Sequence, residues 1–82
     1  MALYFITFRS VTFAQRGEKL LTQKNFRVNL MRTPRWMEEQ GCGYCLRLRR
    51  EEMDSVLAIL RNANVQFRKV YYQTADGNVV EL

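Results

Sequence analysis

The two cysteines, Cys42 and Cys45, are the side chains in this sequence best suited to covalent chemistry. Cys42 stands between Gly41 and Gly43, which carry no side chains to shield it, so we expect an accessible thiol. A nucleophile or a carrier of sulfur needs such a thiol. The sequence contains no histidine, which excludes Ser-His-Asp and Cys-His catalysis and every histidine-ligated metal within one chain. Covalent chemistry must therefore use cysteine, carboxylate, lysine or tyrosine.

The segment before Cys42 supplies the candidate binding residues. Pro34 fixes one backbone angle and biases Thr33 to an extended conformation, which defines how the chain leaves the preceding strand. Arg35 and Arg47 could stabilise a thiolate or an anionic persulfide, whereas Glu38 and Glu39 would raise the pKa of a thiol. The predicted site therefore consists of Cys42 and Cys45 as the reactive thiols, with binding residues Thr33, Pro34, Arg35, Gly41, Gly43 and Arg47.

The Cys-x-x-Cys spacing has other interpretations. In a dithiol oxidoreductase the first cysteine begins a helix, whereas here the motif runs into a predicted strand. Residues three apart on a strand face opposite sides and lie about 10 Å apart, and a disulfide needs Cα atoms within about 7 Å. The pair could close only if Gly43 makes a turn, so single-thiol chemistry is favoured. Zinc would need cysteine pairs from two chains, and Cys45 could also be a small buried hydrophobe.

The elements that must position these residues follow from periodicity and end signals. Ser10 can cap a helix whose apolar face recurs at helical spacing, and Asn25 suits the left-handed residue that ends it. Glu51 and Glu52 open a second helix, which residues 62–64 close. Strands are predicted over Leu3–Phe8, Phe26–Arg32, Tyr44–Arg49 and Gln66–Gln73, helices over 10–24 and 51–62, an Asp76-Gly77 turn, and a possible short extra strand over Val79–Leu82.

This order, β-α-β-β-α-β, predicts one α+β domain over residues 1–82 with a ferredoxin-like fold. Both helices should pack on one face of a four-stranded antiparallel sheet. The first strand is apolar on both faces, which favours a homodimer that covers the second face. That second face is expected to carry Arg27, Asn29 and Met31 from one strand and Cys45, Arg47 and Arg49 from the next.

Two non-enzymatic alternatives depend on that second face. Arg27, Arg47, Arg49 and Lys69 would resemble the surface on which RNA-recognition modules bind bases, but the aromatic-rich signature of those modules is missing from Tyr44–Arg49. The other alternative is a regulatory or assembly module with no chemistry. The net charge of +5 over 82 residues favours acidic partners. No run is long enough to span a bilayer and no export signal is present, so reduced thiols in the cytoplasm are expected.

Several short motifs, in one order, resemble those of the selenium/sulfur carrier protein-like family of small bacterial domains. They are Ser10 to Ala14 at the start of the first helix, Glu18 and Leu21 further along it, Thr33-Pro34-Arg35, and Cys42-Gly43 before the third strand. The resemblance covers Tyr4 to Tyr72, and it departs where Trp36 to Gln40 replace serines and Cys45 replaces a small residue. It implies that Cys42 accepts sulfur or selenium as a persulfide or selenylsulfide and passes it to a partner protein. Because the sequence contains no general base and no cofactor motif, we expect no cofactor and no enzymatic turnover of its own.

Overall fold

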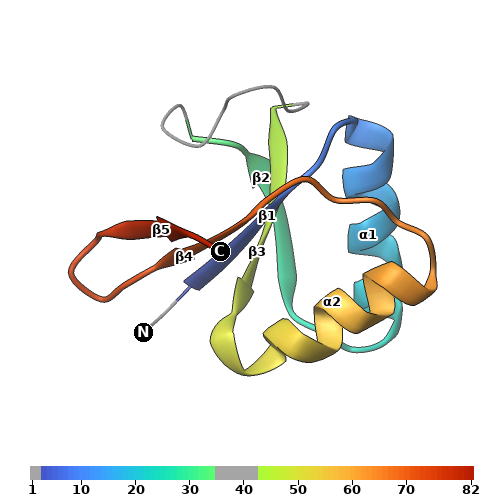
Figure 1. Cartoon of the computed structure of the whole chain (residues 1–82). Helices are drawn as coiled ribbons and strands as arrows, with labels where there is room; N and C mark the ends of the chain where they lie inside the picture. Colours follow the sequence, from blue (N-terminus) through green and yellow to red (C-terminus); the bar gives the residue numbers. More distant parts are fainter. Residues whose placement is uncertain (1–2, 35–42) are drawn as a thin grey trace.

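The computed structural model describes residues 3–34 and 43–82, and it has an α+β fold with two helices and a five-stranded antiparallel sheet (Figure 1). Predicted site residues Arg35, Gly41 and Cys42 lie outside the described residues. The elements in chain order are β1 Leu3–Thr7, α1 Val11–Gln23, β2 Val28–Arg32, β3 Tyr44–Arg49, a 3-10 turn Arg50–Glu52, α2 Met53–Asn62, β4 Val70–Gln73 and β5 Val79–Glu81.

The sheet has the order β2-β3-β1-β4-β5, with β1 at its centre. Strand β1 pairs with β3 through Thr7↔Cys45 and with β4 through Ile6↔Val70, both antiparallel. The sheet has five strands where four were expected. The possible short extra strand predicted over Val79–Leu82 forms as β5 and pairs with β4 in the register Tyr72↔Val80.

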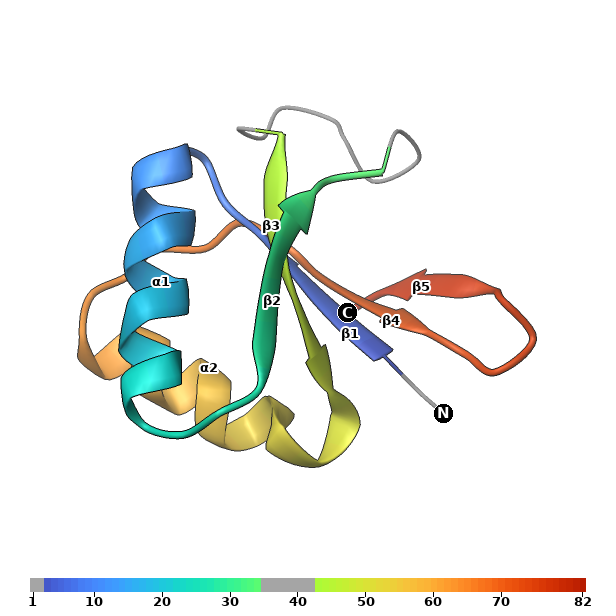
Figure 2. The ribbon, with the colours of Figure 1, turned by 180° about the vertical axis from the view of Figure 1, so that it is seen from behind.

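Both helices cover the same face of the sheet, as the views from the two sides show (Figures 1 and 2). The residues beneath them alternate along the strands, because successive side chains of a strand point to opposite faces. Most of the apolar interior is this layer between helices and sheet. Its buried members are Ile6, Phe8, Ala14, Leu21, Val28, Leu46, Leu48, Met53, Val56, Leu60, Val65 and Val70.

Helix α1 begins and ends as the sequence predicts. The Ser10 hydroxyl accepts a hydrogen bond from the Phe13 backbone N–H at 3.2 Å, which satisfies one of the donors that a helix start leaves unpaired. Asn25 has φ 67°, and the Phe26 N–H donates to the Leu21 carbonyl at 3.0 Å. Asparagine tolerates the left-handed conformation better than most residues, so it ends the helix at low cost.

Helix α1 lies close to both the sheet and α2 at Gly17. A Cβ at Gly17 would stand 3.4 Å from a methyl of Leu46 in β3 and 3.4 Å from a methyl of Leu60 in α2. These are ordinary van der Waals distances, so a methyl group fits at this position. A side chain that extends beyond Cβ would have to displace the two leucine methyls, which costs energy in a packed interior.

Strand β4 is shorter than the predicted strand Gln66–Gln73. The Thr7 N–H donates to the Lys69 carbonyl at 2.9 Å, but the Thr7 carbonyl accepts from the Arg68 N–H at 2.7 Å. Two residues thus stand opposite one, the arrangement of a β-bulge, which bends the strand and interrupts regular pairing. The regular part of the strand therefore begins only at Val70.

The capping hydrogen bond of Ser10 should be measurable in the stability of the domain. We expect Ser10→Ala to lower the free energy of unfolding by about 1 kcal/mol, because the Phe13 N–H loses its partner. Urea denaturation followed by circular dichroism measures the change. Ser55→Ala, an exposed serine inside α2, is the matched control and should leave stability unchanged or slightly higher. Equal effects of the two substitutions would contradict the capping role.

Asp76 organises the turn between β4 and β5, and its pKa lies below the ordinary value. The Thr74 hydroxyl donates to its carboxylate, and the Asn78 backbone N–H donates to it at 3.4 Å. A carboxyl group whose pKa is depressed by folding stabilises the fold above its unfolded pKa, about 3.9, and this stabilisation disappears as pH falls through the folded pKa. We therefore expect wild type to be more stable than Asp76→Asn at neutral pH and the difference to vanish in acid. Urea denaturation of both proteins down to about pH 2.5 tests the convergence.

Candidate functional site

The predicted site belongs to the connection between β2 and β3, whose two ends are held together. Arg32 pairs with Tyr44 in the last step of the ladder, and the Thr33 N–H donates to the Gly43 carbonyl at 2.8 Å. Pro34 follows Thr33 and is partly buried, and a proline here removes no hydrogen bond from the ladder. The two ends of the connection therefore lie side by side, with Thr33 and Pro34 at its start and Gly43 at its end.

Gly43 has φ 83°, in the left-handed region that glycine adopts without steric penalty. Gly43 is therefore not in the conformation of an extended strand. A disulfide between Cys42 and Cys45 would need a turn at Gly43, and Cys42 lies outside the described residues.

Cys45 is buried within β3, with none of its surface exposed. It lies on the sheet face opposite the helices, in a small cluster with buried Phe5 and Tyr71 and partly buried Met31. A thiol in such surroundings acts as a small hydrophobe, because reagents and partners cannot reach it without local opening. Its position supports the structural interpretation of Cys45.

Arg47 lies on the same face of β3 as Cys45, but towards the far end of the strand. It is four residues beyond Gly43, which corresponds to about 13 Å along a strand. Its partners across the ladder are Phe5 and Asn29. Arg47 lines a pocket of about 540 Å³ together with Arg27 and Arg49. The structure therefore groups Arg47 with other arginines rather than with the ends of the β2–β3 connection.

The basic residues considered for nucleic-acid binding are divided between two places. Arg27, Arg47 and Arg49 line the pocket just described. Lys69 lies immediately before β4, and its ammonium group forms an ion pair with Glu81 of β5 at 3.4 Å. A continuous basic track over the second face is not formed by these four residues.

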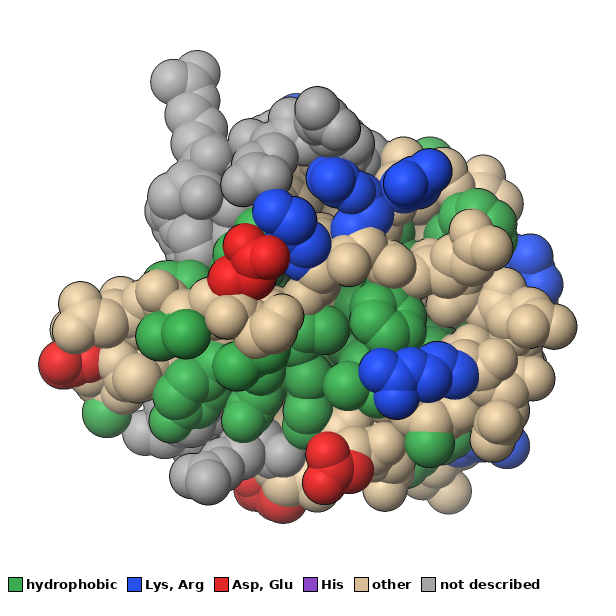
Figure 3. Space-filling view, in the orientation of Figure 1, with side chains coloured by type: hydrophobic (Ala, Val, Ile, Leu, Met, Phe, Trp, Pro, Cys, Tyr) green, Lys and Arg blue, Asp and Glu red, His purple; other side chains and the backbone are tan. Residues whose placement is uncertain are grey.

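Sequence reasoning missed three basic residues that the topology brings towards the β2–β3 connection. The Thr7↔Cys45 pairing places the end of β1 beside the start of β3, and Arg9 follows two residues later. The Arg68 N–H bonds to Thr7 from the neighbouring strand, and the Arg32 guanidinium lies 5.6 Å from the centre of the Tyr44 ring. In Figure 3, Lys and Arg side chains gather near the end of the molecule where β1 leads into α1. Each residue is a lone charge at a strand end, so no sequence pattern marked them.

Metal binding by the described residues alone is not supported. No group of three or more His, Cys, Asp or Glu side chains within residues 3–34 and 43–82 could hold a metal ion. No helix in the same ranges is long and apolar enough to cross a membrane.

The fold and the site define a small α+β domain with one buried thiol and a cysteine-containing connection between β2 and β3. The family model described as "Putative Se/S carrier protein-like" matches residues 3–72. The chain belongs to this family, as the motifs around Ser10, Thr33-Pro34-Arg35 and Cys42-Gly43 indicated. Searches of curated proteins and of solved structures give no significant match.

The burial of Cys45 leads to a test by thiol labelling. In native Cys42→Ser, which retains only Cys45, we expect reaction with Ellman's reagent to be at least about a hundredfold slower than in denaturant, because a buried thiol reacts only in transiently open states. Absorbance at the wavelength of the released thiolate gives both rates. Similar rates in native and denatured protein would show that Cys45 is accessible and available for chemistry.

Proposed function

We propose that this protein carries sulfur or selenium on Cys42, as a persulfide or selenylsulfide, between a donor and an acceptor protein. The observation that carries the proposal is the family match over residues 3–72, a range that includes Cys42-Gly43. The burial of Cys45 supports the assignment to Cys42, because it leaves one of the two thiols of the chain for external partners.

The transfer step needs no oxidant and no metal. The Cys42 thiolate attacks the outer sulfur of a donor persulfide, the bond between that sulfur and the donor's own sulfur breaks, and the donor leaves as a thiolate that takes up a proton. A new S–S bond forms on Cys42, and no net oxidation occurs. Passing the atom to an acceptor thiolate repeats the exchange in the other direction. A selenium atom in the outer position gives the selenylsulfide by the same steps.

The surroundings of the β2–β3 connection support a protein partner with an acidic surface. Arg9 and Arg32 are exposed and Arg68 is partly buried at the strand ends nearest this connection. Positive charge around a reactive thiol also stabilises its thiolate and an anionic persulfide. Complementary charge mainly accelerates encounter and fixes orientation, which suits a carrier that must meet partners and release them.

The remaining parts of the proposal concern architecture and setting. The order β2-β3-β1-β4 supports a ferredoxin-like arrangement to which β5 is added at one edge. A homodimer is supported by the apolar second face of β1, where Leu3, Met31 and Val79 surround the buried cluster and are only partly covered. A reducing cytoplasmic setting would keep both thiols available. Light scattering coupled to gel filtration measures the oligomeric state.

The carrier function is tested by intact mass after incubation with a cysteine desulfurase and cysteine. We expect wild type and Cys45→Ala to gain the mass of one sulfur atom, which a reducing agent removes, and we expect Cys42→Ser to gain none. Alanine is preferred at position 45 because it places no polar hydroxyl at a fully buried position, where burial of a polar group costs free energy. Circular dichroism of each variant checks that it is folded.

Two results would contradict the carrier proposal. One is an adduct that survives Cys42→Ser and disappears in Cys45→Ala. The other is the absence of any adduct on folded wild type while a known persulfide acceptor in the same reaction is loaded. The second result would favour a binding or assembly module without chemistry.

A further inference from the structure

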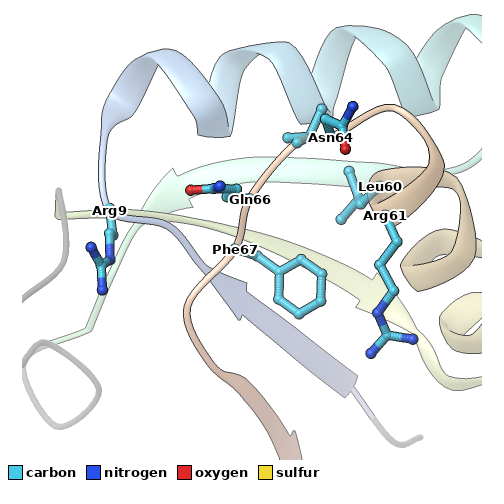
Figure 4. Close-up of a pocket in the computed structure, with 7 residues that line it drawn as sticks. Arg9, Leu60, Arg61, Asn64, Gln66 and Phe67 are labelled. Carbon is cyan, nitrogen blue, oxygen red and sulfur yellow. The ribbon is translucent and has the colours of Figure 1, made fainter.

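A pocket of about 450 Å³ lies between the connection from β1 to α1 and the connection from α2 to β4 (Figure 4). Its floor is apolar: Leu60 is 0% exposed, Val65 is 3% exposed, and the ring of Phe67 is partly buried beside them. Its rim is polar and is formed by Arg9, Arg61, Asn64 and Gln66. Pockets that bind small molecules have this character, with an apolar lining and a few polar groups, and volumes of about 300–1,000 Å³.

The pocket exists because β1 and the chain leading into β4 separate at the bulge. The hydrogen bond from the Arg68 N–H to the Thr7 carbonyl is the last between the two segments, and Arg9 and Phe67 lie beyond it. On the other side, Asn64 ends α2 in a left-handed conformation, with φ 57°, and turns the chain away from the helix. The backbone N–H groups of Gln66 and Phe67 form no hydrogen bond with the described residues.

The charge around the pocket is positive and is not compensated locally. No acidic residue lines it. Arg9 forms no ion pair within the described ranges, and Arg61 lies over the Phe67 ring, 5.7 Å from its centre. Figure 4 shows Arg9 on one side of the Phe67 ring and Arg61 on the other. An anionic group bound near either arginine would gain a charge-assisted hydrogen bond.

We propose that this pocket binds a small organic anion with a flat apolar body. The flat body packs on Phe67 and the apolar floor, and the anionic group is held by Arg9, with Arg61 available to a second polar group at the opposite side. An aromatic ring in contact with a flat ligand adds stacking energy to the burial of apolar surface. None of the lining residues belongs to the β2–β3 connection, and Arg9 is the one residue that the pocket shares with the basic group assigned above to the carrier's partner.

The experiment uses 1-anilinonaphthalene-8-sulfonate as the probe, since it is a flat aromatic anion whose fluorescence reports binding. N-phenyl-1-naphthylamine, which has the same rings without the sulfonate, is the matched neutral probe. We expect one anion per folded chain and binding weakened about tenfold by Arg9→Gln, because one charge-assisted hydrogen bond is lost. Phe67→Leu should also weaken binding. Arg27→Gln, an exposed arginine at the rim of the other pocket, should leave it unchanged.

Amide shifts in two-dimensional NMR give the location, and Gln66 and Phe67 should move most on titration. The proposal is overturned if folded protein does not bind the anion, if the neutral probe binds as tightly, or if Arg9→Gln and Arg27→Gln behave alike. The proposal is also overturned if the amides whose shifts change lie only on another surface of the domain, such as a face that would bind a peptide or a nucleic acid. Cys42→Ser should bind the probe as wild type does, so failure of this site and failure of the carrier proposal are distinguishable.

Discussion

Strand β1 is apolar on both faces and lies at the centre of the sheet, and the rest of the domain is arranged around this constraint. Ile6 and Phe8 point into the layer beneath the helices, while Phe5 joins Cys45 and Tyr71 on the opposite face. A strand that buries side chains on both faces must be flanked by strands on both edges and covered on both sides. The antiparallel partners β3 and β4 supply the edges, and the helices supply one cover. The smaller cluster on the other face explains why a cysteine in β3 is buried.

Thr7, at the end of β1, links the two regions to which we assign function. Through its pairing with Cys45 it joins the end of β1 to the second residue of β3. Through its contacts with Arg68 and Lys69 it forms the bulge that opens the pocket beside Phe67. The Thr7 hydroxyl accepts a hydrogen bond from the Lys69 N–H at 3.1 Å. The bulge therefore leaves this N–H with a partner, although it lacks the backbone carbonyl that regular strand pairing would provide. One buried threonine thus contacts both the start of β3 and the bulge beside the proposed pocket.

The burial of Cys45 shapes the chemistry proposed for Cys42. A carrier works best with one exchangeable atom on one thiol, because a second accessible thiol nearby could displace the sulfur and form a disulfide. Burial of Cys45 protects a persulfide against attack by this second thiol. The backbone leading into Cys45 is not a regular strand throughout, because Gly43 has a positive φ. Exposed arginines at neighbouring strand ends complete a setting in which an anionic persulfide would be stabilised.

Local signals in the sequence determined the elements: the Ser10 cap, the left-handed Asn25, the limits of β3 and the Asp76-Gly77 turn follow from neighbouring residues and were predicted. The motifs likewise identified the family. Only the tertiary structure decided the rest, because it depends on residues far apart in the chain. The bulge that shortens β4 requires Thr7 to meet Arg68, and the pocket requires Arg9 and Phe67 to lie apart beyond that bulge. The spacing of residues along the sequence does not predict these long-range contacts, because the register of hydrogen bonds between strands depends on the packing of the whole sheet.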